Sequence, residues 1–341
     1  MPSGPSGRPP TIYDVAARAK LSIATVSRVL QGTGPVSEKA RTRVDQAARE
    51  LNYVPLRAAR SLAVQRHEAH GLVLPDLAGP FYGDLLMGYE RWAGEHGQSV
   101  IITVTHGNPD PRRTIRDLAG RVDGIVVHGN ALDLPTIQSL RRADVPIVLI
   151  ARPPVTGCDS VRSESAASAE QLTTRLLDHG RTSLLFVGDP ATSYDVSERY
   201  AGFAKAHEAR GLRAPKPEQV PLTEEAGAAV TERVLKAKKR PDGLVCANDE
   251  LALAAVDTLT ANDVDVPGQL VVTGWDDVMA ARYVSPGLTT VRQPMTELGR
   301  LAAQRLHERV TGERTRARND VLATQLVLRD SCGTGSTGLQ Q

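Results

Sequence analysis

Three short segments near the N-terminus carry apolar residues at helical spacing. The first, 12–19, follows Thr11, and an acidic residue three positions after this threonine predicts a capping box. The second covers 22–30, and the third is capped by Ser37 and has apolar residues up to Leu51. Three short helices with a tight turn between the first two predict a helix-turn-helix module over residues 11–55, with an ordinary small helical bundle as the alternative.

The segment after this module has a different texture. Residues 56–64 are rich in Ala, Arg and Leu and follow a proline, which predicts a short helix that is not stable alone. We therefore expect a hinge helix and linker over 56–68, formed only with a partner or DNA. The Pro/Gly/Ser-rich stretch 1–10 predicts a disordered tail, and the Gly/Ser/Thr-rich stretch 331–341 predicts a flexible tail without a heptad pattern.

From residue 69 to 330 short apolar runs alternate with helical stretches, which is typical of strands buried in parallel sheets. The apolar runs are 71–74, 99–102, 124–127, 146–150, 183–187, 243–246 and 270–272. The clearest helical stretches between them are 82–96, 166–179 and 249–261. The expected fold class is an all-α helix-turn-helix head with a hinge helix, followed by an α/β body with two similar parallel-sheet halves and a cleft between them.

Charge separates the two regions further. Residues 1–66 contain eleven Lys and Arg residues but only four Asp and Glu residues, whereas the rest of the chain has more acidic than basic residues. A basic N-terminal segment fits a surface that contacts phosphates, although composition alone is equally compatible with a solvated basic surface.

Several classes of protein are disfavoured. Three widely separated cysteines argue against a disulfide framework and a cysteine-rich zinc site, and His67 and His70 are one residue too close for the zinc-protease motif. No nucleophile elbow or phosphate loop is present, so we expect no enzyme and no cofactor. With no signal peptide and no run of about 18 apolar residues, a cytoplasmic protein without membrane association is expected.

The second helix has the chemistry of a recognition helix. Hydroxyl groups on Ser22, Thr25 and Ser27 suit phosphate contacts. Ile23 and Ala24 lie at the tip, where they can touch a thymine methyl group. Arg28, about one turn later, can donate two hydrogen bonds to a guanine edge.

The chain resembles the LacI/GalR (lactose repressor-type) family of transcriptional regulators. The head carries TIYDVA from Thr11, ATVSRVL from Ala24 and LNYVP from Leu51. Further matches in the body are PDLAGPFY from Pro75, VDGI from Val122, RYAGF from Arg199, ANDE from Ala247, GWDD from Gly274 and PGLTTVRQ from Pro286. The resemblance covers residues 11–330. It implies a periplasmic-binding-protein-like body, with one lobe at about 69–165 and 292–320 and the other at about 166–291 and 321–330.

The resemblance implies the DNA contacts of the head and hinge. It adds Thr11, Tyr13, Ala59 and Leu62 to the recognition-helix residues. Leu62 matches the leucine that is wedged into the minor groove beside the same residue of a second subunit; a core residue at the junction with the body is the alternative.

The resemblance also implies an effector site between the lobes. Arg199, Asn248 and Asp276 match positions that hydrogen-bond the effector, although salt bridges between parts of the body would also explain the charged residues. Four further positions are implied to line the site: Phe81, Tyr82, Glu164 and Leu222. Leu222 stands where several members have a stacking aromatic residue, and Glu164 where Asp is usual.

Three other positions depart from the family pattern. Lys20 replaces the usual Gly in the turn, Leu56 replaces Asn after Pro55, and Arg181 replaces His.

The expected function is that of a homodimeric repressor. It would bind double-stranded operator DNA, with its affinity controlled by a small metabolite, for which a sugar or sugar derivative is expected. A regulator that binds DNA constitutively, or that activates, is the main alternative. An enzyme with an appended head is a second alternative, which the missing catalytic motifs disfavour.

Overall fold

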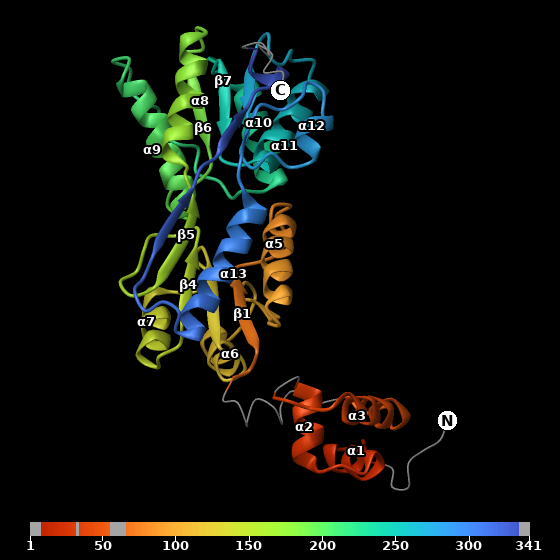
Figure 1. Ribbon diagram of the computed structural model, residues 1–341. Helices are drawn as coiled ribbons and strands as arrows, with labels where there is room; N and C mark the ends of the chain where they lie inside the picture. Colours follow the sequence, from red (N-terminus) through yellow and green to blue (C-terminus); the bar gives the residue numbers. More distant parts are fainter. Residues whose placement is uncertain (1–7, 32–33, 55–65, 334–341) are drawn as a thin grey trace. The chain divides into compact units, whose positions relative to one another are not determined.

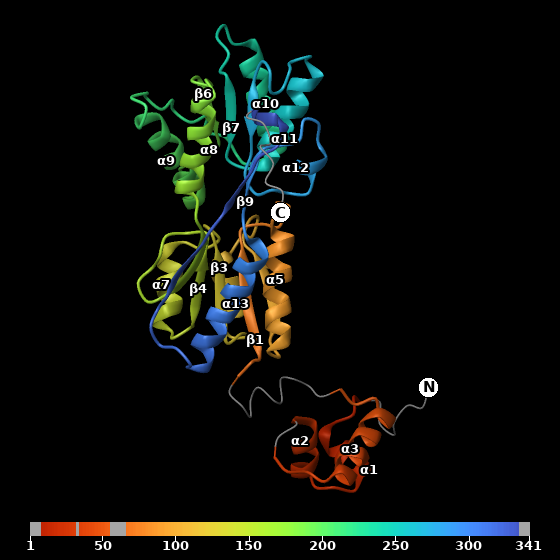
Figure 2. The ribbon, with the colours of Figure 1, turned by 45° about the horizontal axis from the view of Figure 1, so that its top comes forward.

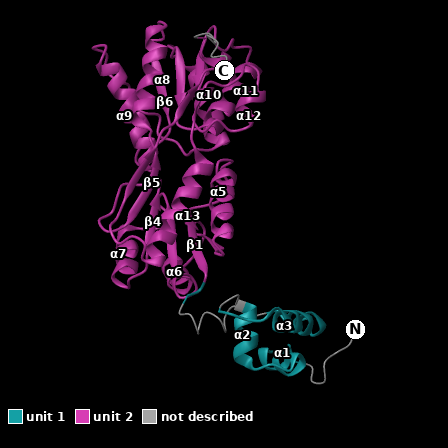
Figure 3. Ribbon diagram, viewed as in Figure 1, with its two compact units in different colours: residues 1–67 teal, residues 68–341 magenta. Residues whose placement is uncertain are grey.

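The computed structural model describes residues 8–31, 34–54 and 66–333 (Figure 1). The chain divides into two compact units, residues 1–67 and 68–341 (Figure 3). None of the helices in the described part of the chain combines the length and apolar character needed to cross a membrane.

The N-terminal unit contains three helices around a small aliphatic core. They are α1 (Ile12–Ala19), α2 (Ile23–Gln31) and α3 (Glu38–Glu50). The core residues recur at helical spacing and comprise Val15, Ala16, Ala19, Val26, Val29, Val44 and Ala47. The predicted three-helix module is thereby confirmed.

Side chains cap the starts of α1 and α3. The Asp14 carboxylate accepts hydrogen bonds from the backbone N–H and the hydroxyl of Thr11, each at 2.7 Å. The Ser37 hydroxyl accepts a hydrogen bond from the backbone N–H of Ala40 at 3.3 Å. Between α1 and α2, Lys20 adopts a left-handed conformation with φ 53° and ψ 49°. The turn therefore keeps the geometry that favours glycine, with lysine in its place.

Lobe one of the C-terminal unit is built on a six-stranded parallel sheet in the order β10-β5-β4-β3-β1-β2. Its strands are β1 (Ala69–Leu74), β2 (Ser99–Val104), β3 (Gly124–His128), β4 (Ile147–Ile150), β5 (Asp159–Ser163) and β10 (Asn319–Leu322). Its helices are α5 (Tyr82–Glu95), α6 (Pro111–Ala119), α7 (Leu134–Arg142) and α13 (Met295–Thr311).

Helices α5 and α13 lie side by side in both views of the ribbon (Figures 1 and 2). Two glycines permit this approach: a Cβ on Gly88 would lie 1.9 Å from the carbonyl oxygen of Thr296, and one on Gly299 would lie 2.0 Å from that of Leu85.

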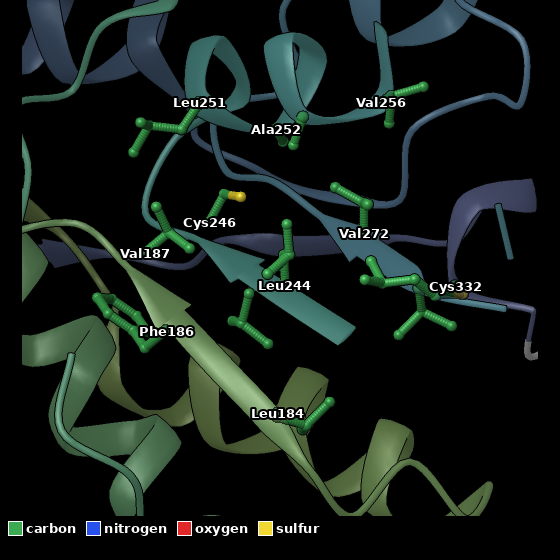
Figure 4. Close-up of a cluster of buried hydrophobic side chains, with 14 of the residues drawn as sticks. Leu184, Phe186, Val187, Leu244, Cys246, Leu251, Ala252, Val256, Val272 and Cys332 are labelled. Atoms are coloured by element: carbon green, nitrogen blue, oxygen red, sulfur yellow. The ribbon is translucent and has the colours of Figure 1, made fainter. Parts of the chain in front are cut away.

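Lobe two contains a three-stranded parallel sheet in the order β6-β7-β8. The strands are β6 (Leu184–Val187), β7 (Gly243–Cys246) and β8 (Val271–Thr273). The helical elements are α8 (Ala166–Asp178), α9 (Tyr194–Glu208), α10 (Glu224–Lys236), α11 (Asp249–Ala261), α12 (Ala280–Tyr283) and the short η1 (Asp330–Cys332). Figure 4 shows aliphatic side chains of β6, β7 and β8 packed with those of α11.

The chain passes between the lobes three times. The passages follow β5, β9 (Thr290–Arg292) and β10, and β9 pairs antiparallel with β11 (Gln325–Val327). Strand β10 pairs with β5 up to Leu322. The chain therefore crosses from lobe one to lobe two after Leu322, and not at the predicted boundary between residues 320 and 321. The predicted parallel sheets in two lobes are confirmed.

Residues 331 and 332 belong to the folded body. The sequence predicted a flexible tail from residue 331, but Ser331 and Cys332 are buried in lobe two, so this boundary was placed too early. The Ser331 hydroxyl donates to the carbonyl of Val272 at 2.6 Å and accepts from the N–H of Thr289 at 2.9 Å, which anchors this end of the chain.

The departure at Arg181 has a structural explanation. Its guanidinium donates to the carbonyls of Pro267 at 2.9 Å and Gly268 at 3.3 Å, so it holds the loop before β8. The departure at Leu56 lies outside the described residues.

Candidate DNA-binding surface and effector site

Helix α2 presents one face to the core and the opposite face to solvent. Val26 and Val29 are buried, whereas Ser22, Ala24 and Arg28 are exposed. This division follows from the helical period, because residues three apart lie on one face. The predicted base-contacting and phosphate-contacting residues therefore share an accessible surface, with Thr25 and Ser27 partly exposed beside them.

Two of the predicted contact residues on the head are large hydrophobic residues that are open to solvent. Tyr13 is 66% exposed and Ile23 is 44% exposed. Ser22 organises the start of α2, since its hydroxyl accepts from the N–H of Thr25 at 3.2 Å and lies 2.9 Å from the Thr25 hydroxyl. Arg28 has no ion pair with any described residue. Ala59 and Leu62 lie outside the described residues.

Arg199, on α9, is the central side chain of the candidate effector site. It is only 5% exposed, and its Nη1 donates to the carbonyl of Ala247 at 2.6 Å. Its guanidinium carbon lies 4.6 Å from the centroid of the Trp275 ring, a cation–π geometry. Burial lowers the pKa of Arg199, while the nearby Asp276, Asp195 and Asp249 oppose that shift. The Nε of Arg199 is buried without a hydrogen-bond partner among the described residues.

Asp276 lies beside this guanidinium in an unusual backbone conformation, with φ 117°. Its Oδ1 accepts from the amide of Gln293 at 2.6 Å. Burial raises the pKa of Asp276 to about 6, against the opposing effect of Arg199. Arg199 and Asp276, about 75 positions apart in the sequence, are thus brought together as predicted.

Asn248 and Leu222 are joined to each other. Asn248 is the N-cap of α11, where its Oδ1 accepts from the N–H of Leu251 at 3.1 Å. Its Nδ2 donates to the carbonyl of Leu222 at 3.2 Å. Asn248 follows Ala247, whose carbonyl binds Arg199, so its capping role places it next to the central arginine.

Phe81 and Tyr82 form an aromatic group with His128 in lobe one. The ring centroids of Phe81 and Tyr82 are 4.2 Å apart, and that of Tyr82 is 5.5 Å from His128. Burial lowers the pKa of His128 to about 4, so the ring is neutral near pH 7. Its Nδ1 is buried without a hydrogen-bond partner among the described residues.

Glu164 has a role at the start of α8. Its Oε1 accepts from the N–H of Ala167 at 2.6 Å and its Oε2 from that of Ser168 at 3.1 Å. Both carboxylate oxygens therefore satisfy free backbone donors of a helix N-terminus.

Glu250 connects the lobe-one aromatic group with the lobe-two charges. Phe81 and Glu250 both lie next to Gly79: a Cβ added to this glycine would be 2.7 Å from the Phe81 ring and 3.6 Å from Oε1 of Glu250. Burial first, then the charge of Asp276, raises the pKa of Glu250 to about 7. Glu250 in turn raises the pKa of Tyr82, after burial and Asp76.

Comparison with known proteins identifies the two units. The profile of bacterial regulatory proteins of the lacI family matches residues 11–55, and that of the periplasmic binding protein-like domain matches residues 173–332. The chain is 32% identical over 335 residues to the HTH-type transcriptional regulator CelR of Thermobifida fusca, covering 95% of this chain and 98% of CelR. The chain belongs to the lacI family of bacterial regulatory proteins.

Other members of the lacI family are similar over nearly the whole length. The ribose operon repressor of Escherichia coli (strain K12) is 31% identical over 309 residues, covering 88% of this chain and 93% of that repressor. A solved CelR–cellobiose complex superposes with a TM-score of 0.73 at 31% identity, covering 94% of this chain and 99% of that structure. A lac repressor dimer bound to operator and the anti-inducer ONPF superposes with a TM-score of 0.84 at 27% identity, covering 95% of this chain and 99% of that structure.

The predicted family and fold are thus confirmed, and the chain is a DNA-binding transcriptional regulator of the lacI family. Its relatives are regulators rather than enzymes. Within the described ranges, no three His, Cys, Asp or Glu side chains are grouped closely enough to hold a metal ion.

Several residues that lie close to the candidate effector site were not predicted from the sequence. Asp195 carries a raised pKa through burial, opposed by Arg199 and Arg162, and the guanidinium carbon of Arg162 lies 5.9 Å from the ring centroid of Tyr194. Arg162 comes from β5 and Tyr194 from α9, so this contact spans the lobes. Only His128 carried a signal in the sequence, as a polar residue at the carboxyl end of an apolar strand, where ligands bind in parallel sheets.

Proposed function

We propose that this regulator represses transcription as a homodimer on a near-palindromic operator, and that a sugar or sugar derivative bound between its lobes controls operator affinity. CelR was solved with cellobiose, and another relative is a ribose operon repressor. The lac repressor was solved as a dimer on its operator. A two-fold dimer with one recognition helix in each subunit requires two half-sites related by a dyad.

The head divides DNA recognition between two kinds of contact. Arg28 reads a guanine, while Ile23 and Ala24 fit against base edges. The hydroxyl groups and Tyr13 contact the backbone and position the helix; they comprise Thr11, Tyr13, Ser22, Thr25 and Ser27. The full or partial exposure of every member of this set on one module supports the assignment. Ala59 and Leu62, at the hinge, complete it, with Leu62 as the minor-groove wedge.

The observation that carries the effector proposal is the free Nε of Arg199. A buried guanidinium N–H without an acceptor costs free energy, and a ligand oxygen would satisfy it. Asp276 and Asp195 supply acceptors beside it for sugar hydroxyl groups. Trp275, on the face of Arg199, holds the guanidinium in place. Phe81, Tyr82 and Leu222 provide apolar walls, and Asn248 and Glu164 fix the helix ends that border the site.

Control of DNA binding requires that the ligand distinguish two arrangements of the lobes. Residues of both lobes meet at Arg162 and Tyr194 and at Phe81 and Glu250, so a ligand that contacts both sides favours one lobe angle. By linkage, operator DNA changes effector affinity by the same factor that effector changes operator affinity.

The test is a gel shift on the native operator with cellobiose and ribose as probes. We expect one of the two sugars to change operator affinity by roughly 5- to 150-fold in the unmodified protein. Arg199→Ala and Asp276→Ala should each abolish this response while operator affinity without sugar stays near normal. The matched control is Lys205→Ala, an exposed residue on α9 that should respond normally.

Two results would contradict the proposal. Full sugar affinity in Asp276→Ala, measured by titration calorimetry, would place the effector elsewhere. Equal sugar affinities of the free protein and its operator complex would mean that the chain binds DNA constitutively. The dimer is tested separately, by sedimentation and by a footprint, which should show dyad symmetry.

A further inference from the structure

The two lobes touch each other through surface loops as well as through the three passages of the chain. Asn130 lies in lobe one, two residues after the end of β3. Its Nδ2 donates a hydrogen bond to the carbonyl of Thr192, in lobe two, at 3.3 Å. Both residues are exposed, so neither side chain belongs to a core. This hydrogen bond therefore depends on how the lobes are oriented and not on the packing inside either lobe.

A second contact joins the same stretch of lobe two to β5 in lobe one. The guanidinium carbon of Arg162 lies 5.9 Å from the centroid of the Tyr194 ring, within the range of a cation–π interaction. Burial raises the pKa of the next residue, Asp195, whereas the charges of Arg199 and Arg162 oppose this shift. Asp195 is thus within electrostatic reach of one arginine from each lobe, and Arg162 attracts the first turn of α9 through both a ring and a carboxyl group.

Both contacts converge on residues 189–194, which connect β6 to α9. The segment has a defined turn, because the N–H and the hydroxyl of Thr192 both donate to the carbonyl of Asp189, at 3.2 and 2.9 Å. It leads directly into α9, where Arg199 follows Tyr194 after five residues, about 7.5 Å along the helix axis. A movement of this segment is therefore transmitted to Arg199 through a short length of helix.

We propose that residues 189–194 form a latch that holds the lobes in this arrangement through contacts of the chain itself, and that Asn130 and Arg162 are positioning residues of the allosteric switch. The inference rests on the proposed function, because a latch affects regulation only if the lobe arrangement controls operator affinity. It adds to that function a contribution of the chain, which sets how much of the ligand-free protein adopts each arrangement.

The size of these contacts fits a role in the switch better than a role in stability. One exposed hydrogen bond or one cation–π contact corresponds to a change of roughly two- to tenfold in an equilibrium constant. Such a change is small for a folded body of this size. It is large for two lobe arrangements whose free energies differ little, because the minor arrangement is then already populated.

The first test measures how often the latch is closed. A short bismaleimide should join the two cysteines of Asn130→Cys/Thr192→Cys within one chain, detected by mass spectrometry of the full-length protein. The three native cysteines are buried, so they should react slowly. The added substitution Arg162→Gln should slow cross-linking roughly two- to tenfold, because it removes the remaining latch contact. Arg162→Lys, which keeps the charge, should restore part of the rate.

The reciprocal pair tests Asn130. Cross-linking of Arg162→Cys/Tyr194→Cys should slow roughly two- to tenfold when Asn130→Ala is added, because the hydrogen bond to Thr192 is lost. The matched control for both pairs is Arg112→Gln. Arg112 is an exposed arginine of lobe one that pairs with Asp133 in the same lobe, so this change should leave both rates unaltered. A purely structural role of Asn130 or Arg162 predicts a lower melting temperature with unaltered cross-linking of the folded protein.

The second test connects the latch with regulation. Once Asn130→Cys/Thr192→Cys is cross-linked, cellobiose and ribose should no longer change its operator affinity in a gel shift, whereas the same protein without cross-linker should respond. Unaltered cross-linking rates in the Arg162→Gln and Asn130→Ala backgrounds would overturn the latch. A full sugar response of the cross-linked protein would overturn its role in the switch and leave the proposed function standing. If the protein without cross-linker responds to neither sugar, the proposed function fails, and the cross-linking rates still decide whether the latch exists.

Discussion

The proposed DNA-binding surface and the proposed effector site differ in how exposed their side chains are. On α2 the functional side chains are exposed, and Arg28 is held by no ion pair with a described residue. Around Arg199 the functional side chains are buried, hydrogen-bonded to the backbone and shifted in pKa. An exposed contact residue is separable from the fold, whereas a buried one also contributes to stability. Substitutions should therefore have different consequences at the two sites.

The comparison is sharpest at Asp249, the fully buried neighbour of Asn248. Its Oδ1 accepts from the Thr290 hydroxyl at 2.6 Å and its Oδ2 from the N–H of Val278 at 2.9 Å. Asp249→Ala leaves both donors unsatisfied, so we expect the free energy of unfolding to fall by about 2–5 kcal/mol. Denaturant unfolding measures this. Asp257→Ala, an exposed position on the same helix, should stay within about 0.5 kcal/mol of the unmodified protein.

At the DNA-binding surface the expected pattern is reversed. Arg28→Ala should weaken specific operator binding by about 1–3 kcal/mol and relax the preference at one base in each half-site. Its free energy of unfolding should change by less than about 0.5 kcal/mol. Ser27→Ala should weaken binding to all sequences alike, since phosphates carry no sequence information. If Arg28→Ala lowers the affinity for operator DNA and for random DNA equally, Arg28 contacts a phosphate and not a base.

Burial of carboxyl groups also predicts a pH dependence. Burial, then Asp276, raises the pKa of Asp249 from 3.8 to about 8, so the folded state binds a proton that the unfolded chain releases. The stabilisation is complete below about pH 4 and is lost as the pH rises to about 8, with a slope of at most about 1.4 kcal/mol per pH unit. Asp249→Asn should flatten this slope in denaturant titrations between pH 5 and 8. An unchanged slope would exclude Asp249 as its source.

The smallest expected effect concerns the turn before α2. Lys20 has a left-handed conformation, which costs a residue with a Cβ about 1 kcal/mol relative to glycine. Lys20→Gly should therefore slow hydrogen exchange in α1 and α2 and leave exchange in the body unchanged. Faster exchange in these helices would show that lysine contributes contacts that outweigh the strain.

Local signals account for much of the fold. The seven apolar runs correspond to strands β1 to β4 and β6 to β8. Most of these strands are buried along their length and are therefore apolar throughout, whereas β2, at the edge of its sheet, is only partly buried. The sequence pattern did not predict β5, β9, β10 and β11, whose residues are partly polar. These strands lie at the edge of a sheet or near the passages between the lobes, where only the tertiary structure supplies their partners.

The sequence by itself determined the family, the helix-turn-helix module and its outward-facing contact residues, since helical period and capping are local properties. It also placed Arg199 and Asp276 in one site through the family resemblance. Only the tertiary structure decided that Asn248 and Glu164 bind backbone donors at helix starts and that Arg181 holds a loop. Those roles depend on which backbone and charged groups distant segments bring together, and hydrogen bonding and desolvation act on that arrangement rather than on residue order.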